Sequence, residues 1–385
     1  MTAPKLRFKA FGEEWHSIAV GKFLKVKSGL GFKAEEYTTE EEIRLLQIEN
    51  VGYGTVKWTH NVKFVPSNYL ELHKDLVLKE GDLVLALNRP VTNDQLKIAK
   101  LTKEDSPSIL YQRVGKLDFL NEDFDRDFIF QIFQKDVKSY VLNSSIGSDQ
   151  PFISTTDLYK HKLSIPSKEE QTKIASFLSA VDEKISQLTQ KHELISQYKQ
   201  GMMQKLFSQQ IRFKADDGSE FGEWEDLKFK DVITIKYGKD HKNLKDGDIP
   251  VLGTGGVMRY ADSYLYDGES ILIGRKGTID KPQLISGKFW TVDTLFYTEI
   301  GEKILPKFAF QQLLLVNWLN LNEATGVPSL NATSIGNIDM RVPYREEQTK
   351  IANFLSAIDQ KIEVVAQQIE QTKTWKKGLL QKMFV

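Results

Sequence analysis

A long internal repeat constrains the fold of this chain more than any other feature of its sequence. Residues 166–207 and residues 343–384 align without a gap, and about half of the aligned positions are identical. Self-similarity of this length indicates a duplicated structural plan and outweighs any single short motif. The sequence therefore predicts two copies of one arrangement.

The segment that follows the first copy is also repeated. Residues 211–215 lead into Trp224, and residues 6–10 lead into Trp15 in the same way. The order of lead segment, variable block and long repeat thus occurs twice, and the variable blocks share only scattered landmarks. This order predicts two domains at residues 1–165 and 211–342, with long helices at residues 166–210 and 343–385.

Both copies of the repeat carry the signals of a long amphipathic helix. Ser167 and Glu170 form a capping-box pattern directly after Pro166, so a helix should begin there. Apolar residues then recur in alternating steps of four and three, which is the spacing of a coiled-coil seam. They are Ile174, Leu178, Val181, Ile185 and Leu188 in the first copy, and Ile351, Leu355, Ile358, Ile362, Val365 and Ile369 in the second.

A helix with such a seam needs a partner to cover it. The nearest candidate is the other copy, and the alternation of domain and helix favours an antiparallel, pseudo-twofold pair. Two unrelated surface helices, each packed on its own domain, are the alternative. Gly201 and Gly378 occupy equivalent places in the two copies and predict close packing or a bend. The fold class expected is α+β, with two similar domains separated by two long helices that form an antiparallel coiled coil.

This duplicated layout resembles the specificity subunits of type I restriction-modification systems. Each variable block is followed by the pattern I-P-x-x-x-E-Q-x-x-I-A and a long helix, with valine at the first position of the second copy. Residues 271–278 and the pair Phe289-Trp290 are also typical of the target-recognition domains of that family. The resemblance covers essentially the whole chain. The residues that match the pattern are Ile165, Pro166, Glu170, Gln171, Ile174 and Ala175, and then Val342, Pro343, Glu347, Gln348, Ile351 and Ala352.

The resemblance implies a protein with no catalytic activity of its own. In that family each variable domain recognises one half of a split duplex DNA target. The paired helices set the spacer between the halves and dock two adenine-N6 methyltransferase subunits, and ATP-dependent restriction subunits that translocate DNA join this core. It therefore implies no cofactor for this chain, and S-adenosylmethionine, ATP and Mg²⁺ for the partner subunits.

Basic and amide side chains are the candidates for DNA contact. Arg275 and Lys276 lie in a glycine-flanked loop, where glycine permits close approach of the backbone and arginine can pair bidentately with guanine. Arg89 is the expected counterpart of Arg275 in the first domain. Gln47 and Asn50 have the amide chemistry for adenine but could equally satisfy strand ends. The predicted DNA contacts are Lys27, Gln47, Asn50, Arg89, Gln150, Lys236, Lys239, Arg275, Lys276 and Thr278.

The lysines in that set are phosphate-contact candidates, and a simple solvated face is the alternative for each. The outer faces of the predicted helices are rich in charged and amide side chains, which could also be mere solvation. In the family such faces meet the methyltransferase subunits. The candidate partner contacts are Glu169, Glu170, Gln171, Glu346, Glu347 and Gln348.

The residues offer little catalytic chemistry. The chain has no cysteine, which excludes a disulfide scaffold and fits a reducing cytosol. Its six histidines are scattered without metal-ligand spacing, so no metal site is expected. The sequence contains neither a Pro-Pro pair for an adenine methyltransferase motif nor a G-x-x-x-x-G-K-[ST] loop. No apolar run is long enough to span a bilayer, so a cytoplasmic protein without membrane contact is expected.

The net charge does not support DNA binding by this chain alone. Lys plus Arg and Asp plus Glu each total 52, so the formal net charge is zero. Proteins that bind DNA alone are usually basic. Either this chain does not bind DNA, or its basic residues are local and partners supply further phosphate contacts. The alternative function is a two-headed coiled-coil scaffold for protein interactions without DNA binding. A basic strip on the domains would favour the DNA-binding hypothesis.

Overall fold

The computed structural model describes residues 4–144 and 152–384, and the candidate Gln150 lies outside them. The chain divides into two compact units. The first unit contains the residues up to 187 together with those from 369 onward, and the second unit contains residues 188–368. Each unit therefore takes part of each long helix. The domains predicted from the sequence are continuous stretches of chain, whereas the first unit combines two separate stretches. The predicted boundaries stay a prediction.

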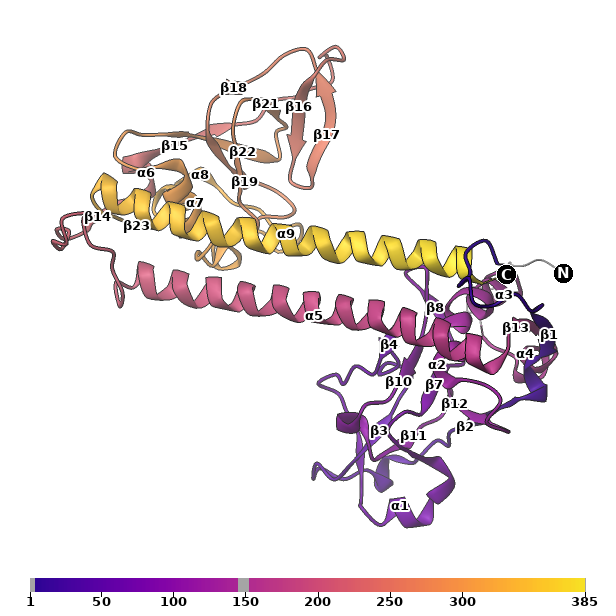
Figure 1. The fold of residues 1–385 in the computed structure, drawn as a ribbon. Helices are drawn as coiled ribbons and strands as arrows, with labels where there is room; N and C mark the ends of the chain where they lie inside the picture. Colours follow the sequence, from indigo (N-terminus) through magenta and orange to yellow (C-terminus); the bar gives the residue numbers. More distant parts are fainter. Residues whose placement is uncertain (1–3, 145–151, 385) are drawn as a thin grey trace. The chain divides into compact units, whose positions relative to one another are not determined.

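The two copies of the repeat form long helices, as predicted. Helix α5 spans Lys168–Phe207 and helix α9 spans Arg345–Met383 (Figure 1). At the start of α5 the Ser167 hydroxyl accepts a hydrogen bond from the Glu170 N–H at 3.4 Å. Only this half of the capping box forms, because the Glu170 side chain binds Arg7 instead. None of the helices in the described parts of the chain has an apolar stretch that could span a bilayer.

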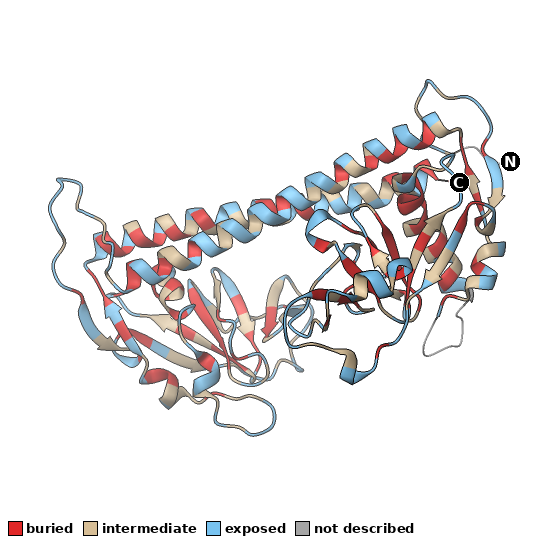
Figure 2. Cartoon of the chain, turned by 90° about the horizontal axis from the view of Figure 1, so that it is seen from below, coloured by how far each residue is buried: buried red, intermediate tan, exposed pale blue. Residues whose placement is uncertain are grey.

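The predicted apolar seam is largely buried along both helices. Figure 2 shows buried and exposed bands alternating along α5 and α9, as expected for helices that present one apolar face to a partner. The buried seam positions are Ile174, Leu178, Val181 and Leu188 in α5, and Ile351, Leu355, Ile358, Val365 and Ile369 in α9.

The two helices run antiparallel and pack together. In the first unit Asp182 of α5 pairs with Lys376 of α9 at 2.7 Å, and in the second unit Lys199 of α5 pairs with Asp359 of α9 at 2.6 Å. As the residue number rises along one helix, it falls along the other. The alternative of two unrelated surface helices is therefore wrong.

The helix glycines do not mark close packing, which was one of the two expected alternatives, and the other alternative, a bend, stays a prediction. A Cβ added at Gly201 or at Gly378 would meet no other atom within 4 Å. The space beside both residues is open, so neither glycine is required by a neighbouring side chain.

The first unit is built on two mixed sheets. Its central strand β7 (Leu83–Ala86) is buried along its whole length, which explains the continuous apolar run in the sequence. The five-stranded sheet has the order β2 (Leu24–Ser28), β12 (Val114–Phe119), β7, β10 (Ile98–Lys100) and β4 (Gly54–Thr55). The four-stranded sheet has the order β5 (Phe64–Val65), β3 (Ile43–Leu46), β11 (Ser108–Leu110) and β6 (Val77–Leu78).

Short elements complete the first unit. The two-stranded pairs are β1 (His16–Ala19) with β13 (Lys162–Ile165), and β8 (Val91–Thr92) with β9 (Gln95–Leu96). The helices are α1 (Tyr69–Leu72), α2 (Arg126–Ile132), a π-helical turn (Phe133–Val137), α3 (Lys138–Ser144) and α4 (Thr155–Lys160).

The second unit repeats the plan with its own strand lengths. Its fully buried central strand is β19 (Ser270–Gly274). One sheet has the order β15 (Ile233–Tyr237), β22 (Leu295–Ile300), β19 and β20 (Gln283–Ile285). The other has the order β17 (Gly256–Ala261), β16 (Ile249–Gly253), β21 (Lys288–Thr291) and β18 (Tyr266–Asp267). The remaining elements are β14 (Glu225–Lys228) paired with β23 (Asp339–Val342), α6 (Phe229–Val232), α7 (Pro306–Leu313), a 3-10 helix (Trp318–Leu321) and α8 (Ala332–Gly336).

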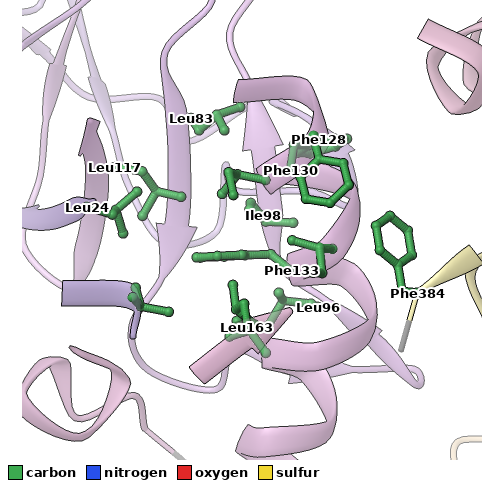
Figure 3. Close-up of a cluster of buried hydrophobic side chains, with 14 of the residues drawn as sticks. Leu24, Leu83, Leu96, Ile98, Leu117, Phe128, Phe130, Phe133, Leu163 and Phe384 are labelled. Carbon is green, nitrogen blue, oxygen red and sulfur yellow. The ribbon is translucent and has the colours of Figure 1, made fainter. Parts of the chain in front are cut away.

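An aromatic contact joins a helix end to the core of each unit. Figure 3 shows the leucine and phenylalanine cluster of the first unit, with Phe384 beyond the end of α9 beside Phe128. The centroids of these two rings lie 5.4 Å apart. In the second unit Phe207 at the end of α5 lies 5.4 Å from Phe308 in the same way. The core of each unit therefore includes the far end of one long helix.

Candidate nucleic-acid interface

Several loops of the second unit meet where β15, β19 and β21 end. The Lys239 N–H donates to the Thr291 carbonyl at 2.8 Å, and the Arg275 N–H donates to the Thr294 carbonyl at 2.8 Å. We call the surface formed by residues 238–239, 254–255, 275–278 and 292–294 the β19 edge. It brings together four of the predicted DNA contacts, Lys239, Arg275, Lys276 and Thr278.

Two glycines shape the loop after β19. A Cβ added at Gly274 would lie 2.0 Å from the Thr278 carbonyl oxygen, so no larger residue fits where the chain turns back. Gly277 has a φ of 90°, in the left-handed region that favours glycine. A Cβ on Gly277 would lie 3.6 Å from the Thr254 hydroxyl oxygen, so the turn after β16 lies against this loop. The loop is compact and leaves Lys276 and Thr278 exposed.

Arg275 is held in place at the β19 edge, whereas its neighbours extend into solvent. Its guanidinium lies over the Tyr237 ring at 5.6 Å, and its Nη1 donates to the Asp293 carbonyl at 3.2 Å. A side chain fixed in this way loses less entropy on binding. Lys239 and Lys276 are exposed cations, and the Asp293 carboxylate is an exposed acceptor. The edge thus offers both the donors that match guanine and an acceptor that matches cytosine.

In the first unit Leu87, and not Arg89, takes the place of Arg275. The Leu87 N–H donates to the Arg113 carbonyl at 2.9 Å, which is the bond that Arg275 makes to Thr294. The expected equivalence of Arg89 and Arg275 is therefore wrong by two residues. An alignment that matches the two arginines in the sequence does not reveal this shift, because the pairing of the neighbouring strands fixes the register.

Arg89 instead occupies the position of Gly277. Strand pairing aligns Ala86 with Val114 in the first unit and Gly274 with Leu295 in the second, so three residues further on Arg89 matches Gly277. Both have left-handed backbones, with φ values of 45° and 90°. Arg89 is exposed, so it remains available for the predicted contact.

A turn of the first unit was missed by reasoning from the sequence. Residues Tyr111–Arg113 connect β11 to β12, and Gln112 and Arg113 are both exposed. The Gln112 N–H donates to the Leu30 carbonyl at 2.9 Å, which holds the turn against the loop after β2. The available signal was a polar pair set between two apolar strand segments.

Asn50 has a structural role. It is fully buried, its side-chain oxygen accepts from the Gln47 N–H at 2.9 Å, and its amide donates to the Lys57 carbonyl at 3.1 Å. The predicted DNA contact is wrong for Asn50, because its amide is used within the turn. Asn50 therefore matches the alternative given above, in which the amide satisfies backbone groups at the end of a strand. The Gln47 side chain is half-buried and stays a prediction.

Lys27 and Lys236 lie on strands and are both paired. Lys27 of β2 contacts Asp75 at 2.5 Å, and the ammonium group lowers the pKa of the Asp75 carboxyl. Lys236 of β15 contacts Glu299 of the neighbouring strand at 3.2 Å. Both lysines are half-exposed, and a phosphate would have to compete with these carboxylates. Their role in DNA binding stays a prediction.

A family comparison decides what kind of chain carries this surface. The family model described as "Type I restriction modification DNA specificity domain" matches residues 12–197 and 222–374, which is most of the chain. The chain belongs to this family. The two matched stretches correspond to the two repeats found in the sequence, so the predicted resemblance is confirmed.

Curated proteins similar to this type I specificity chain have related names. It is 37% identical over 203 residues to the MjaVIII specificity subunit of Methanocaldococcus jannaschii, a match that covers 52% of this chain and 47% of that protein. It is 29% identical over 192 residues to the EcoAI specificity subunit of Escherichia coli, covering 49% and 31%. The chain thus matches less than half the length of either relative.

Solved structures of the same kind have the same fold. The S subunit of a type I restriction-modification system from M. genitalium superposes with a TM-score of 0.65 at 17% identity, covering 100% of this chain and 99% of that one. A chain from a study of type I complex assembly superposes with a TM-score of 0.54 at 16% identity, covering 97% and 98%. The predicted fold class, two α+β domains with two paired long helices, is confirmed.

Two glutamates predicted to contact partners are buried in this specificity chain. Glu170 is 1% exposed, and Arg7 donates to its two carboxylate oxygens at 2.7 Å each. Glu347 is fully buried, and both Arg212 and the Trp224 indole N–H donate to it. These carboxylates raise the pKa of Arg7 and Arg212, chiefly through the side-chain hydrogen bonds. They anchor the lead segments to the helices.

The two neighbouring glutamines are also structural. Gln171 accepts from the Asp125 N–H at 2.9 Å, and Gln348 accepts from the Leu305 N–H at 2.7 Å. Both are buried, so the outward-facing position expected for Glu170, Gln171, Glu347 and Gln348 is wrong. Their partners lie far away in the sequence, so the helix pattern alone could not reveal them. Glu169 and Glu346 are exposed and stay predictions.

The charged side chains of the first unit form a structural network beside α9. They line a cavity of about 490 Å³ between the β8–β9 hairpin and the helices. Its acids and bases are paired with one another, as expected for side chains that hold the β8–β9 hairpin and the helices in place. Among the described residues, no three His, Cys, Asp or Glu side chains gather to hold a metal. The ion pairs are Asp94 with Lys138 and Lys377, Asp182 with Lys376, and Glu370 with Lys373.

Proposed function

We propose that this chain is the DNA-specificity subunit of a type I restriction-modification complex, with no catalytic activity of its own. Each unit recognises one part of a two-part duplex target. The β19 edge and its counterpart in the first unit support this most directly. They share the same backbone hydrogen bonds but carry different donors, Arg275 and Lys276 in one and Arg89 and Arg113 in the other. A shared scaffold with different donors suits two different base sequences, because base edges differ in their donors and acceptors.

We further propose two adenine-N6 methyltransferase subunits as partners, and ATP-dependent restriction subunits that join through them. The internal repeat supports this, since it gives both units a similar helix sequence and so offers one kind of partner two equivalent docking faces. The exposed Glu169 and Glu346, near the starts of α5 and α9, are the candidate contacts. S-adenosylmethionine, and ATP with Mg²⁺, would be bound by those partners.

The helix pair is proposed to set the spacer between the two parts of the target. Helix α5 has 40 residues and helix α9 has 39, so each extends about 60 Å. An uninterrupted helix is stiff along its axis, and a second helix packed along its seam stiffens it further. A change in helix length should therefore change the spacer and leave both half-sites unaltered.

A methylome of the host with and without this gene tests the proposal. Loss of N6-methyladenine at one split motif, restored by the wild-type gene, is the expected result. Complementation with Arg275→Ala should alter one half of the motif. Lys214→Ala removes an exposed cation paired with Glu220 and serves as the control that restores the wild-type motif. An unchanged methylome in a host that expresses the methyltransferase would instead favour the protein-interaction scaffold.

A further inference from the structure

Two arginines of the first unit have backbones that arginine seldom adopts. Arg89 has a φ of 45° and Arg113 a φ of 65°, both in the left-handed region. Among the other described non-glycine residues of the first unit, Asn93 and Asp94 have positive φ, but they form the tight turn of the β8–β9 hairpin, where Asn and Asp are well tolerated. Left-handed conformations of other residues cost free energy and cluster at functional sites.

The fold brings these two arginines to the same end of neighbouring strands. Arg113 directly precedes β12, and its carbonyl accepts from the Leu87 N–H at 2.9 Å. Leu87 directly follows β7, and Arg89 is two residues further on. The left-handed turns therefore occur side by side on the surface that corresponds to the β19 edge of the second unit.

Their guanidinium groups are free, unlike those of the other arginines of the unit. Arg7 binds Glu170, Arg44 lies over Trp58 at 4.3 Å, and Arg126 lies over Phe119 at 5.3 Å. Arg89 and Arg113 are exposed and have no side-chain partner within residues 4–144 and 152–384.

The second unit shows that this backbone does not need arginine. Gly277 corresponds to Arg89, and Thr294 corresponds to Arg113. At the first of these positions the second unit has the residue that accepts a positive φ without cost. The first unit keeps an arginine there despite the strain, and packing does not account for it because the side chain is exposed.

We propose that Arg89 and Arg113 recognise guanine in the major groove and set the half-site of the first unit. This inference rests on the proposed function, which it deepens by naming a base and the residues that recognise it. The planar guanidinium fork matches guanine O6 and N7 bidentately, and this is the commonest specific contact between proteins and DNA. Gln112, exposed between Tyr111 and Arg113, has the amide that pairs with an adjacent adenine.

The variants Arg113→Gly and Arg89→Gly test the proposal with little risk to folding. Glycine adopts both φ values without strain, so the melting temperature should stay the same or rise while the guanidinium is lost. The assay is methylation by the complete complex of duplexes with one half-site randomised at a time. Loss of a bidentate pair should lower the preference for guanine at one position of one half-site by at least about fivefold. Arg126→Ala, with the same charge change in the same unit, is the control and should keep the wild-type preference.

The outcomes separate this inference from the function on which it rests. An unchanged guanine preference in both variants would overturn the inference alone. So would a uniform weakening across all sequences, because that is the signature of a phosphate contact. Wild-type complexes whose methylation pattern does not depend on this chain would overturn the proposed function, and the inference with it.

Discussion

The Arg212 guanidinium donates two hydrogen bonds to the Glu347 carboxylate, at 3.0 Å from Nε and 2.6 Å from Nη2. Arg7 holds Glu170 in the same way in the first unit. Each pair joins a lead segment to the first turn of a long helix across more than a hundred residues of sequence. The acid is buried in both cases, so each pair contributes to stability mainly by compensating a charge that has no access to water.

Removal of Arg212 alone should therefore be costly. We expect Arg212→Ala to lower the free energy of unfolding by about 3–5 kcal/mol, because it leaves the buried Glu347 carboxylate without a cationic partner. Denaturant titration followed by circular dichroism measures this loss. The double variant Arg212→Met with Glu347→Leu removes both charges and should recover most of it. Equal losses in the single and double variants would show that the buried charge is not the cause.

Acid should weaken the first unit through His161. The centroid of its imidazole lies 4.8 Å from that of the Tyr140 ring, with the two planes tilted by 34°. Burial lowers its pKa from 6.5, although the nearby Asp136 carboxylate opposes this shift. The unfolded chain then takes up a proton near pH 6.5 that the folded chain resists. This contribution to stability is complete above pH 6.5 and is lost as the pH falls below it.

The variant His161→Phe should flatten that pH dependence. Phenylalanine keeps the ring contact with Tyr140 and cannot be protonated, and the buried Nε2 that it replaces has no hydrogen-bond partner among the described residues. Melting temperatures between pH 7.5 and pH 5.5, a window chosen around the value in unfolded chains, provide the measurement. His60→Phe, at an exposed position, should keep the wild-type slope. Identical slopes in all three proteins would exclude His161 as the cause.

Alanine at the two helix glycines should stabilise the chain. Gly201 and Gly378 lie inside α5 and α9 with open space beside them, so a methyl group meets no obstacle. We expect each change to raise the free energy of unfolding by up to about 1 kcal/mol, because alanine restricts the unfolded chain and favours the helix. Chemical denaturation of Gly201→Ala and Gly378→Ala measures it. A loss of stability would reveal a packing requirement at these positions.

Lengthening both helices should lengthen the proposed spacer. Seven residues inserted after Leu188 and after Val365 keep the apolar seam in phase, since the seam repeats every seven residues. The methylated motif should keep both half-sites and gain base pairs between them, which a methylome measures. Insertion into α5 alone makes α5 one heptad longer than α9, so the contacts at both ends of the helix pair can no longer all form, and it should abolish methylation. Altered half-sites with an unchanged spacer would contradict the idea that the helices set the distance.

The duplicated plan and the long helices could be predicted from the amino-acid sequence. Their signals are local and periodic: the capping position Ser167, the seam from Ile174 to Leu188 and its second copy can be recognised without knowing where the chain goes next. A period of three and four residues specifies a helix with one apolar face wherever it occurs. The family resemblance followed from the same repeats, and the family comparison confirmed it.

Which polar side chains are free could not be predicted from the sequence and follows from how distant segments pack. Glu170 and Glu347 looked like exposed helix positions, but arginines far away in the sequence bury and bind them. Arg89 looked like the counterpart of Arg275 until strand pairing set the register two residues apart. Arg113 became a candidate only through its left-handed backbone and its lack of a partner among the described residues. Burial, register and pairing depend on segments that meet after folding, so no local pattern encodes them.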